Sequence, residues 1–357
     1  MKIVIFGNMG YVGPGLISRL RSTYPTATLI GYDTGFFASC LTDVDYLPER
    51  KLDRQYFGDI RNVPENIMQG ADAVINLAAI SNDPMGTKFE EVTLDVNHRS
   101  GIALAKRAKE LGVKSFVFAS SCSVYGAASD APKTEDSTLN PLTAYARSKV
   151  MSEQDLEPLA DQDFKVTCLR FGTACGMSPR LRLDLVLNDF VACALTSKHI
   201  TILSDGTPWR PLINVKDMAR AMEWAIGRPA SFGNFLAVNT GAEKWNYQVK
   251  DLAEAVASVI PDVKVSLNKE AFAPDKRSFR VNFSLYKKLA PDYQPEYDLV
   301  TTIKELTSGL EAMNFNDLQF RDSKLIRLKV LTSLQQKNEL NSELRWQNQQ
   351  QSEPIAI

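Results

Sequence analysis

Side chains that could together move a proton lie near the middle of the chain. Residues 119–126 read ASSCSVYG, so hydroxyl and thiol groups follow directly after the apolar run 113–119. Further along, Tyr145 and Lys149 form a YxxxK pattern. Positions i and i+4 of a helix share a face, so the phenol and the ammonium group can point into one site. A nearby cation lowers the pKa of a phenol toward neutrality, which makes it a usable acid or base.

The start of the chain carries a second candidate site, because the apolar run 2–6 leads into the GxxGxxG pattern of residues 7–13. Glycines at a turn between strand and helix let the backbone approach a pyrophosphate, and the following helix presents free N–H groups. Asp33 ends the next apolar run, where a carboxylate can accept from a ribose 2′-OH. A carboxylate repels a 2′-phosphate, and the next basic residue is Arg50, so the pattern predicts NAD rather than NADP.

The elements that would position these motifs alternate along the first half of the chain. Segments 16–21 and 101–111 have helical apolar spacing and separate short apolar runs. Such alternation is typical of a parallel sheet with helices on both faces. We therefore predict an α/β fold, a Rossmann-type doubly wound parallel sheet with a smaller C-terminal substrate-binding lobe. The runs predicted as strands are 2–6, 28–32, 73–78, 114–119, 165–170 and 234–239.

The chain is long enough for a large domain with an attached lobe. We predict an NAD-binding Rossmann domain at 1–173, with 210–242 returning to it, and a substrate-binding lobe from 174–209 and 243–316. Leucines at 325, 328, 331 and 334 predict that the remainder, 317–357, begins as a helical extension. The Gln-rich end of the sequence predicts a polar tail.

Composition excludes several classes of protein. The 357 residues are 44% apolar, and 41 basic residues nearly balance 42 acidic ones, which argues against a partner that is a nucleic acid or a membrane. No apolar run is long enough for a signal sequence or a membrane span. Five scattered cysteines without a CxxC motif favour a reducing, cytoplasmic location. The two histidines, His98 and His199, lie apart, so a metal site is not expected.

Together these motifs resemble the NAD-dependent epimerase/dehydratase family of extended short-chain dehydrogenases/reductases, whose members mostly act on nucleotide sugars. The resemblance extends from residue 1 to about residue 285. It implies NAD as the cofactor, a nucleotide-diphosphate sugar as the substrate, and a homodimer formed through helices near 90–110 and 145–157. Besides GxxGYVG and YxxxK, the matching pieces are GDI (58–60), NLAA (76–79), VNHRSG (96–101), SSCSVYG (120–126), LRFGTACG (169–176) and GTPWRPLINVKDMARA (206–221).

The resemblance also implies a role for individual residues. Ser121 would hydrogen-bond the sugar oxygen being oxidised, Tyr145 would take its proton, and Lys149 would hold the ribose and tune the phenol. The cofactor-binding set would be Gly7, Asn8, Met9, Gly10, Tyr11, Val12, Gly13, Asp33, Asp59, Ile60, Leu77, Ala78, Ala79, Asn97, Tyr145 and Lys149. Within this set, Asp59 and Ile60 would flank the adenine, residues 77–79 the dinucleotide backbone, and Asn97 the strand that positions it. The substrate-binding set would be Ser121, Thr173, Arg180, Arg182, Asn188, Arg210 and Arg277, with Arg210 gripping the diphosphate because guanidinium groups bind phosphates bidentately.

Departures from the family pattern narrow the reaction and leave alternatives open. Dehydratases of the family carry an Asp-Glu pair where this chain has Cys122 and Ser123, so elimination of water is disfavoured. Cys122 is either an acid/base for epimerisation or, as we favour, a small buried residue. The leading prediction is an NAD-dependent nucleotide-sugar epimerase, and the runner-up is a ketoreductase or dehydrogenase of a similar sugar. A non-catalytic NAD-sensing regulator is the third alternative, against which the intact Ser121, Tyr145 and Lys149 set counts.

Overall fold

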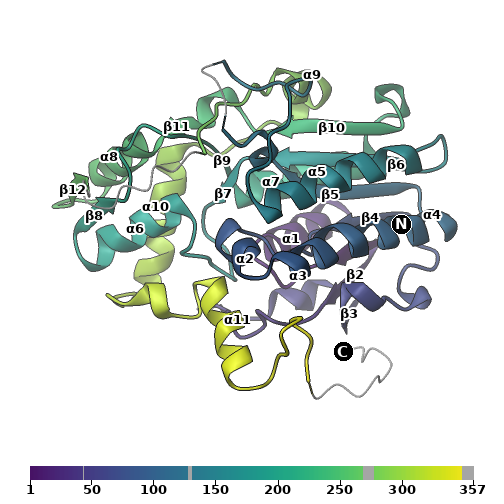
Figure 1. The fold of residues 1–357 in the computed structure, drawn as a ribbon, viewed down its shortest axis with the longest axis horizontal. Coiled ribbons are helices and arrows are strands. Elements are labelled where there is room, and N and C mark those ends of the chain that lie inside the picture. Colours follow the sequence, from purple (N-terminus) through teal and green to yellow (C-terminus); the bar gives the residue numbers. More distant parts are fainter. Residues whose placement is uncertain (43, 128–130, 268–276, 348–357) are drawn as a thin grey trace.

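A computed structural model describes residues 1–42, 44–127, 131–267 and 277–347. Its largest element is a seven-stranded sheet in the order β10-β6-β5-β4-β1-β2-β3, in which every neighbouring pair is parallel (Figure 1). This is the predicted Rossmann-type α/β fold. The strands are β1 (Lys2–Phe6), β2 (Thr28–Asp33), β3 (Arg54–Phe57), β4 (Ala73–Asn76), β5 (Ser115–Ser121), β6 (Lys165–Phe171) and β10 (Phe235–Thr240).

Helices cover both faces of this sheet, which explains why its central strands are almost entirely apolar. On one face, α1 (Gly13–Thr23) and α7 (Val215–Gly227) pack on β1, β4 and β5. On the other face lie α4 (Ser100–Glu110) and α5 (Ala144–Leu156). The sequence did not predict β3, because its residues RQYF are half polar and form a short edge strand.

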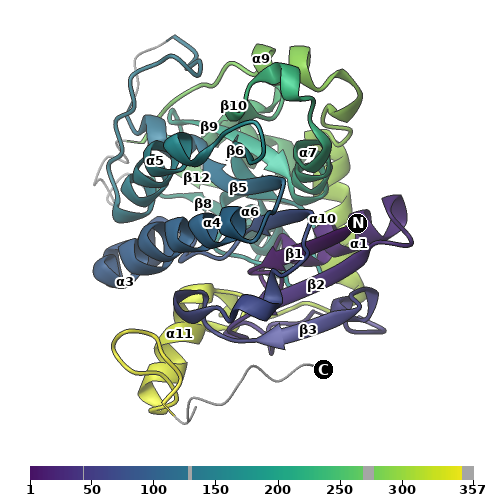
Figure 2. The same ribbon diagram turned by 90° about the vertical axis from the view of Figure 1, so that its right-hand side faces the viewer.

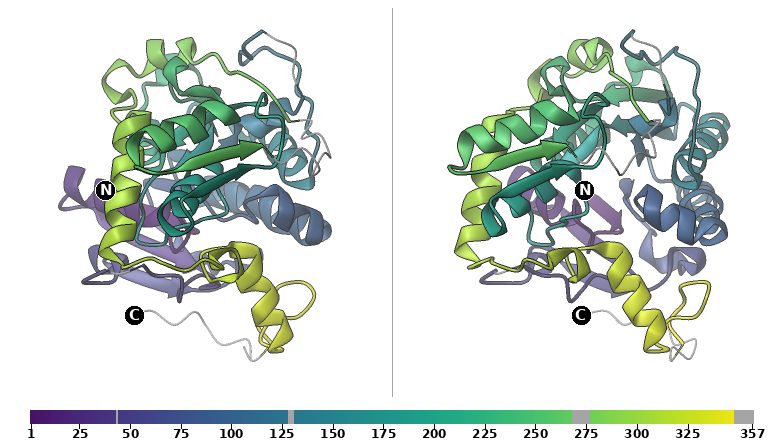
Figure 3. Two further views of the ribbon diagram at one scale, coloured as in Figure 1. Left: turned by 90° about the vertical axis from the view of Figure 1, so that its left-hand side faces the viewer. Right: turned by 60° about the vertical axis from the view of Figure 1, so that its left-hand side comes forward.

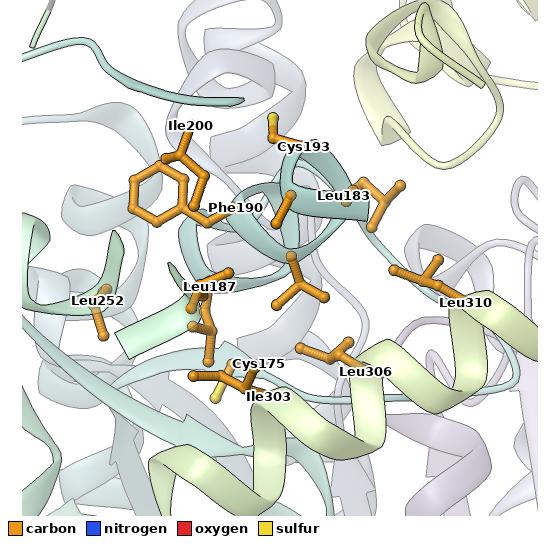
Figure 4. Close-up of a cluster of buried hydrophobic side chains, with 14 of the residues drawn as sticks. Cys175, Leu183, Leu187, Phe190, Cys193, Ile200, Leu252, Ile303, Leu306 and Leu310 are labelled. Carbon is orange, nitrogen blue, oxygen red and sulfur yellow. The ribbon is translucent and has the colours of Figure 1, made fainter. Parts of the chain in front are cut away.

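The smaller lobe follows the carboxyl end of β6 and contains two small sheets (Figure 1). One consists of β11 (Asn246–Gln248), β9 (Trp209–Asn214) and β7 (Thr173–Cys175), and the other of β12 (Lys264–Leu267) and β8 (His199–Ile202). The helices α6 (Val186–Thr196), α8 (Val249–Val259) and α10 (Leu299–Ala312) enclose its apolar core, part of which Figure 4 shows. Within the segment 210–242, β9 pairs in this lobe, whereas α7 and β10 belong to the main sheet.

Short helices and the C-terminal part complete the chain. The segment after β4 forms α2 (Asp83–Lys88), α3 (Glu90–Leu94) and a π-helical turn at Asp95–Arg99. After α9 (Ser284–Leu289) and α10, the chain crosses to α11 (Arg327–Gln336), near the end of the sheet formed by β2 and β3 (Figures 2 and 3). The helix α11 lies within the segment 317–357 that is predicted to begin as a helical extension, and residues 348–357 of the predicted polar tail lie outside the described residues.

Candidate active site

One large cleft, of about 1370 Å³, lies between the carboxyl ends of the sheet strands and the smaller lobe. In doubly wound sheets ligands bind at this edge. Most of the residues predicted to bind cofactor or substrate line it, although they come from segments far apart in the sequence. These are Gly7, Gly10, Tyr11, Val12, Asp33, Asp59, Ile60, Leu77, Ala78, Ala79, Ser121, Tyr145, Lys149, Thr173, Arg182, Arg210 and Arg277.

The glycine-rich turn forms one wall of the cleft and requires its glycines. Gly7 has φ +79°, and a Cβ there would lie 2.5 Å from the backbone nitrogen of Ala78. A Cβ on Gly13 would lie 1.8 Å from the backbone oxygen of Asn8. Glycine is the residue that tolerates such close approaches. This turn leaves bare backbone next to the start of α1, the place where the sequence pattern predicts the pyrophosphate.

Asp33 ends β2 inside the cleft. Its carboxylate accepts hydrogen bonds from the backbone N–H of Met9 at 3.0 Å and of Gly35 at 2.8 Å. Burial raises the pKa of Asp33, and the two N–H donors oppose that shift. These bonds fix the carboxylate beside the glycine turn, where it can accept a further bond from a ribose hydroxyl.

The other side of the predicted adenosine site begins at Asp59. Its carboxylate is bound by the guanidinium group of Arg61, with Nη2 at 2.6 Å and Nε at 2.9 Å and 3.0 Å. Arg61 lines the cleft as well, and sequence reasoning did not identify it. Its side chain is only 4% exposed, so Arg61 neutralises Asp59 inside the protein.

Four predicted cofactor residues do not line the cleft, namely Asn8, Met9, Gly13 and Asn97. The side chain of Asn97 binds the backbone of Ile80 through both its oxygen, at 2.8 Å, and its nitrogen, at 3.1 Å. The amide of Asn8 donates to Gln55 at 2.6 Å, and Met9 contributes its backbone N–H to Asp33. These contacts hold the loops that line the cleft. Asn97 therefore holds the loop after β4 in place.

The three proposed catalytic residues converge on one part of this cleft. Ser121 is the last residue of β5, and Tyr145 and Lys149 lie one turn apart on α5. Thr143 caps that helix by accepting from the N–H of Ala146 at 3.1 Å. The Lys149 Nζ donates to the carbonyl of Ala119 at 2.7 Å and lies 5.5 Å from the centre of the Tyr145 ring.

Burial dominates the electrostatics of this group. It lowers the pKa of Lys149 to about 8 and raises the pKa of Tyr145 to about 12. A hydrogen bond with Ser121 acts to lower the pKa of the phenol, while the charge of Asp83 acts to raise it. The YxxxK pattern predicts instead that a nearby cation lowers the pKa of the phenol toward neutrality. The residues of the chain by themselves raise the pKa of Tyr145, because the desolvation of the phenol outweighs the effects of the nearby groups.

The neighbours of Ser121 have structural contacts. Cys122 is buried, its thiol donates to the backbone oxygen of Arg170 at 3.1 Å, and burial strongly raises its pKa. Such a thiol is a poor acid or base at neutral pH, which favours the interpretation of Cys122 as a small buried residue. Ser120 bonds Glu153, and the hydroxyl of Tyr125 donates to Asn239 at 2.6 Å.

The predicted substrate-binding residues divide into two groups. Arg182, Arg210 and Arg277 line the cleft, as does Thr173. Arg182 forms a two-pronged ion pair with Asp184 at 2.9 and 3.0 Å and donates to Ser81 at 3.0 Å. Arg210 donates to the backbone oxygen of Arg277.

Arg277 in turn forms an ion pair with Asp83. The cleft therefore has guanidinium groups on the side of the smaller lobe.

Arg180 and Asn188 do not line the cleft. Arg180 is buried and forms an ion pair with Glu49 at 2.7 Å. The side chain of Asn188 donates to the hydroxyl of Tyr11 at 3.0 Å and accepts from the N–H of Gly176 at 3.0 Å. Both residues join the smaller lobe to segments of the Rossmann part. Motif matching suggested them as substrate ligands because it cannot distinguish a buried contact from an exposed one. We do not retain either as a substrate ligand.

Several cleft residues come from the C-terminal part of the chain, which the sequence motifs did not reach. Arg321 lines the cleft and pairs with Asp189 at 2.8 Å. Arg327 and Leu344 line it too. No motif signalled these residues, since they lie beyond the part that resembles the family. The acid two residues after Arg182 was visible in the sequence as RLRLD, and it could have been predicted to pair with that arginine.

Each of the two histidines contacts another polar side chain. His98 contacts Asp155 at 2.7 Å and His199 contacts Ser266 at 2.8 Å, and neither lines the cleft. Within the described residues, no group of three His, Cys, Asp or Glu side chains could hold a metal ion.

Among the helices of the described residues, none is long and apolar enough to cross a membrane.

Comparison with known proteins gives the class of this fold and site. The sequence pattern of the NAD dependent epimerase/dehydratase family matches residues 3–241. The chain therefore belongs to this family of enzymes, and NAD is its cofactor. The resemblance predicted from the motifs is confirmed.

Individual relatives carry the names of different reactions. The chain is 26% identical over 318 residues to YtcB of Bacillus subtilis, described as an uncharacterized UDP-glucose epimerase, covering 85% of this chain and 95% of that protein. It is 29% identical over 261 residues to the dTDP-glucose 4,6-dehydratase of Streptomyces griseus, covering 70% and 76%. The UDP-glucuronic acid 4-epimerase of Bacillus cereus has the same fold, with a TM-score of 0.75 at 21% identity, covering 88% of this chain and all of that one.

Proposed function

We propose that this protein epimerises a nucleotide-diphosphate sugar by way of a transient keto sugar. One observation carries the proposal: Ser121, Tyr145 and Lys149 meet on the wall of one cleft. The same cleft is lined by the glycine-rich turn and by arginine side chains of the smaller lobe. Bound NAD would accept a hydride from the sugar and return it. YtcB of Bacillus subtilis, which is similar over 85% of this chain, carries an epimerase name, and this supports the proposal.

The three residues would divide the proton chemistry between them. Tyr145 would remove the proton from the hydroxyl being oxidised and later return it, with Ser121 hydrogen-bonding the same oxygen. Lys149 would bind the ribose and, when protonated, favour the ionised phenol. Because the phenol pKa is high in the chain alone, the positive charge of Lys149 and of the oxidised cofactor would have to lower it during turnover.

The smaller lobe would hold the diphosphate while the sugar changes its orientation. Arg210 donates to the backbone of Arg277, and Arg277 also contacts Asp83, the first residue of α2. Guanidinium groups in such a chain form a fixed anchor for phosphate oxygens. An anchor at the diphosphate leaves the keto sugar free to turn and to receive the hydride on its other face.

Asp33 supports the choice of NAD over NADP. Both of its oxygens are held by backbone N–H groups, so the carboxylate cannot rotate away to admit a 2′-phosphate.

The absence of an acid at positions 122 and 123 disfavours dehydration, because the buried thiol of Cys122 cannot replace the carboxyl group that water elimination needs.

The proposal is tested by incubating the purified protein with UDP-, GDP-, dTDP- and CDP-hexoses and analysing the products by NMR. We expect two sugar nucleotides of one type to interconvert without added cofactor. Net oxidation or reduction of the sugar would instead support the runner-up, a nucleotide-sugar ketoreductase or dehydrogenase. If the protein binds NAD and sugar nucleotides but converts none, the regulator alternative is favoured.

We also propose that the protein is a homodimer. The proposed contact surface consists of the helices near 90–110 and 145–157, where Met151 is 39% exposed. Light scattering coupled to gel filtration measures the mass directly. A monomer at micromolar concentration would contradict this part of the proposal. The cytoplasmic location stays a prediction from the sequence.

A further inference from the structure

The end of the described chain forms a closed loop at residues 339–347, which we call the C-terminal loop. The N–H of Gln347 donates to the backbone oxygen of Glu339 at 2.9 Å, which closes the base of the loop. Inside it, the N–H of Asn341 donates to the oxygen of Arg345 at 3.0 Å. The loop therefore has a defined shape, although it contains no regular helix or strand.

Two side chains attach the C-terminal loop to the Rossmann part. The indole N–H of Trp346 donates to the backbone oxygen of Thr34 at 2.8 Å, and its ring lies 5.7 Å from that of Phe36. Arg61 donates to the backbone oxygens of Glu343 at 2.8 Å and Leu344 at 3.2 Å. Both attachment points follow directly after residues assigned to the adenosine half of the cofactor, since Thr34 follows Asp33 and Arg61 follows Ile60.

Leu344 is the part of the loop that reaches the cleft. It is 1% exposed, lines the cleft, and packs in an apolar cluster with Ile80, Met85 and Leu331. Its backbone has φ +54°, a left-handed conformation that non-glycine residues seldom adopt. The closed loop and the bonds from Arg61 hold Leu344 in this conformation, so its side chain has a fixed place at the cleft wall.

We propose that the C-terminal loop is the outer wall of the adenosine end of the NAD site, and that its detachment controls the release of NAD. The inference uses NAD as the cofactor of the family and does not depend on which sugar reaction the enzyme performs. Release through this end of the cleft requires Leu344 and Trp346 to leave their contacts. NAD should therefore dissociate slowly while the C-terminal loop is attached.

Arg61 connects the loop to the adenosine site electrostatically. It binds Asp59 and the loop carbonyls with the same guanidinium group, and Arg345 of the loop lies 3.8 Å from Asp59. Detaching the loop would remove acceptors from a nearly buried guanidinium group and expose Asp59 to solvent. Occupancy of the adenosine site and attachment of the loop should thus favour each other.

The test measures the dissociation rate of NAD from the purified holoenzyme after mixing with an enzymatic trap for free NAD. Leu344→Gly removes the wall side chain at a position whose positive φ suits glycine. Trp346→Ala removes the attachment at Thr34 without changing a residue that lines the cleft. Ser342→Ala, an exposed residue of the same loop, is the matched control. We expect at least a tenfold faster release from the first two variants and an unchanged rate from the control.

Thermal unfolding of the cofactor-free proteins separates this role from a general loss of structure. If Leu344→Gly and Trp346→Ala fold but release NAD within twofold of the wild-type rate, the proposal is wrong. If either variant fails to fold, the rate is measured for Arg345→Gln and for the chain ending at Asn338, and an unchanged rate in both of these also overturns it. A folded wild-type protein that cannot bind NAD at all would contradict the cofactor assignment instead, so the two failures are distinguishable.

Discussion

At the scale of single residues, the site depends on groups whose properties burial changes. Tyr145 and Lys149 have pKa values shifted in opposite directions, up for the phenol and down for the amine, because both charged forms lose their water. The sequence placed the two residues correctly on one helical face, but their spacing contains no information about desolvation. The direction of the shift for Tyr145 could therefore not be predicted from the pattern.

Tyr145→Phe should retain NAD and lower the turnover number by about 10²- to 10⁴-fold, since proton transfer to a positioned side chain contributes that much. The substitution removes only the hydroxyl, so the packing of α5 is preserved. Turnover with the true sugar nucleotide and the NAD content per chain are the two measurements. Near-normal turnover in this variant would remove Tyr145 from the mechanism.

The lowered pKa of Lys149 predicts that the affinity of the protein for NAD depends on pH. With a pKa of about 8, the amine is protonated at pH 7 and largely neutral at pH 9. The ammonium form of Lys149 would donate stronger hydrogen bonds to the ribose than the neutral amine does, so the affinity should be highest below pH 8 and fall severalfold as the pH rises through that value. Calorimetric titration of the cofactor-free protein at pH 7 and pH 9 measures the change. Lys149→Met should bind more weakly at pH 7 and lose the dependence, and a variant that keeps it would show that another group titrates.

At the scale of elements, α5 must hold its register against the sheet so that Tyr145 faces Ser121. A buried ion pair connects this helix to β6, because Glu153 contacts Arg170 at 2.6 Å with both side chains less than a tenth exposed. Arg170 also donates to Tyr125 at 2.9 Å, which extends the network to the segment after β5. The helix and the strand were both predicted from apolar periodicity. The ion pair was not, since periodicity does not show which charged residues face inward.

Glu153→Gln should lower the free energy of unfolding by about 3–5 kcal/mol, because it leaves the buried charge of Arg170 without its partner. Glu91→Gln is the matched control. Glu91 contacts Arg99 at 3.4 Å, but both side chains are more than half exposed, so the loss should be below about 1 kcal/mol. Urea unfolding of the three proteins gives the difference, and equal losses in both variants would contradict the structural role of the buried pair.

At the scale of the whole molecule, the parts of the site that motifs define were predictable and the parts built from distant contacts were not. The glycine turn, Asp33 and the YxxxK helix each lie within one short segment, so a local pattern predicts each of them. The rule that ligands bind at the carboxyl ends of parallel strands then predicts that they meet in one site. Arg180 and Asn188 matched by position but point to Glu49 and Tyr11. The C-terminal residues of the cleft lie beyond the family pattern and could be found only in three dimensions.

The central claim is that the enzyme takes a hydride from a sugar and returns it to the same sugar in the same active site. The most direct test uses the sugar nucleotide that the NMR screen identifies, carrying deuterium at the carbon that is epimerised, and follows label and absorbance at 340 nm together. We predict that the product epimer keeps the deuterium at that carbon, that the holoenzyme needs no added NAD, and that no net absorbance change accompanies turnover. Loss of the label to solvent, or stoichiometric formation or consumption of NADH, would contradict the claim.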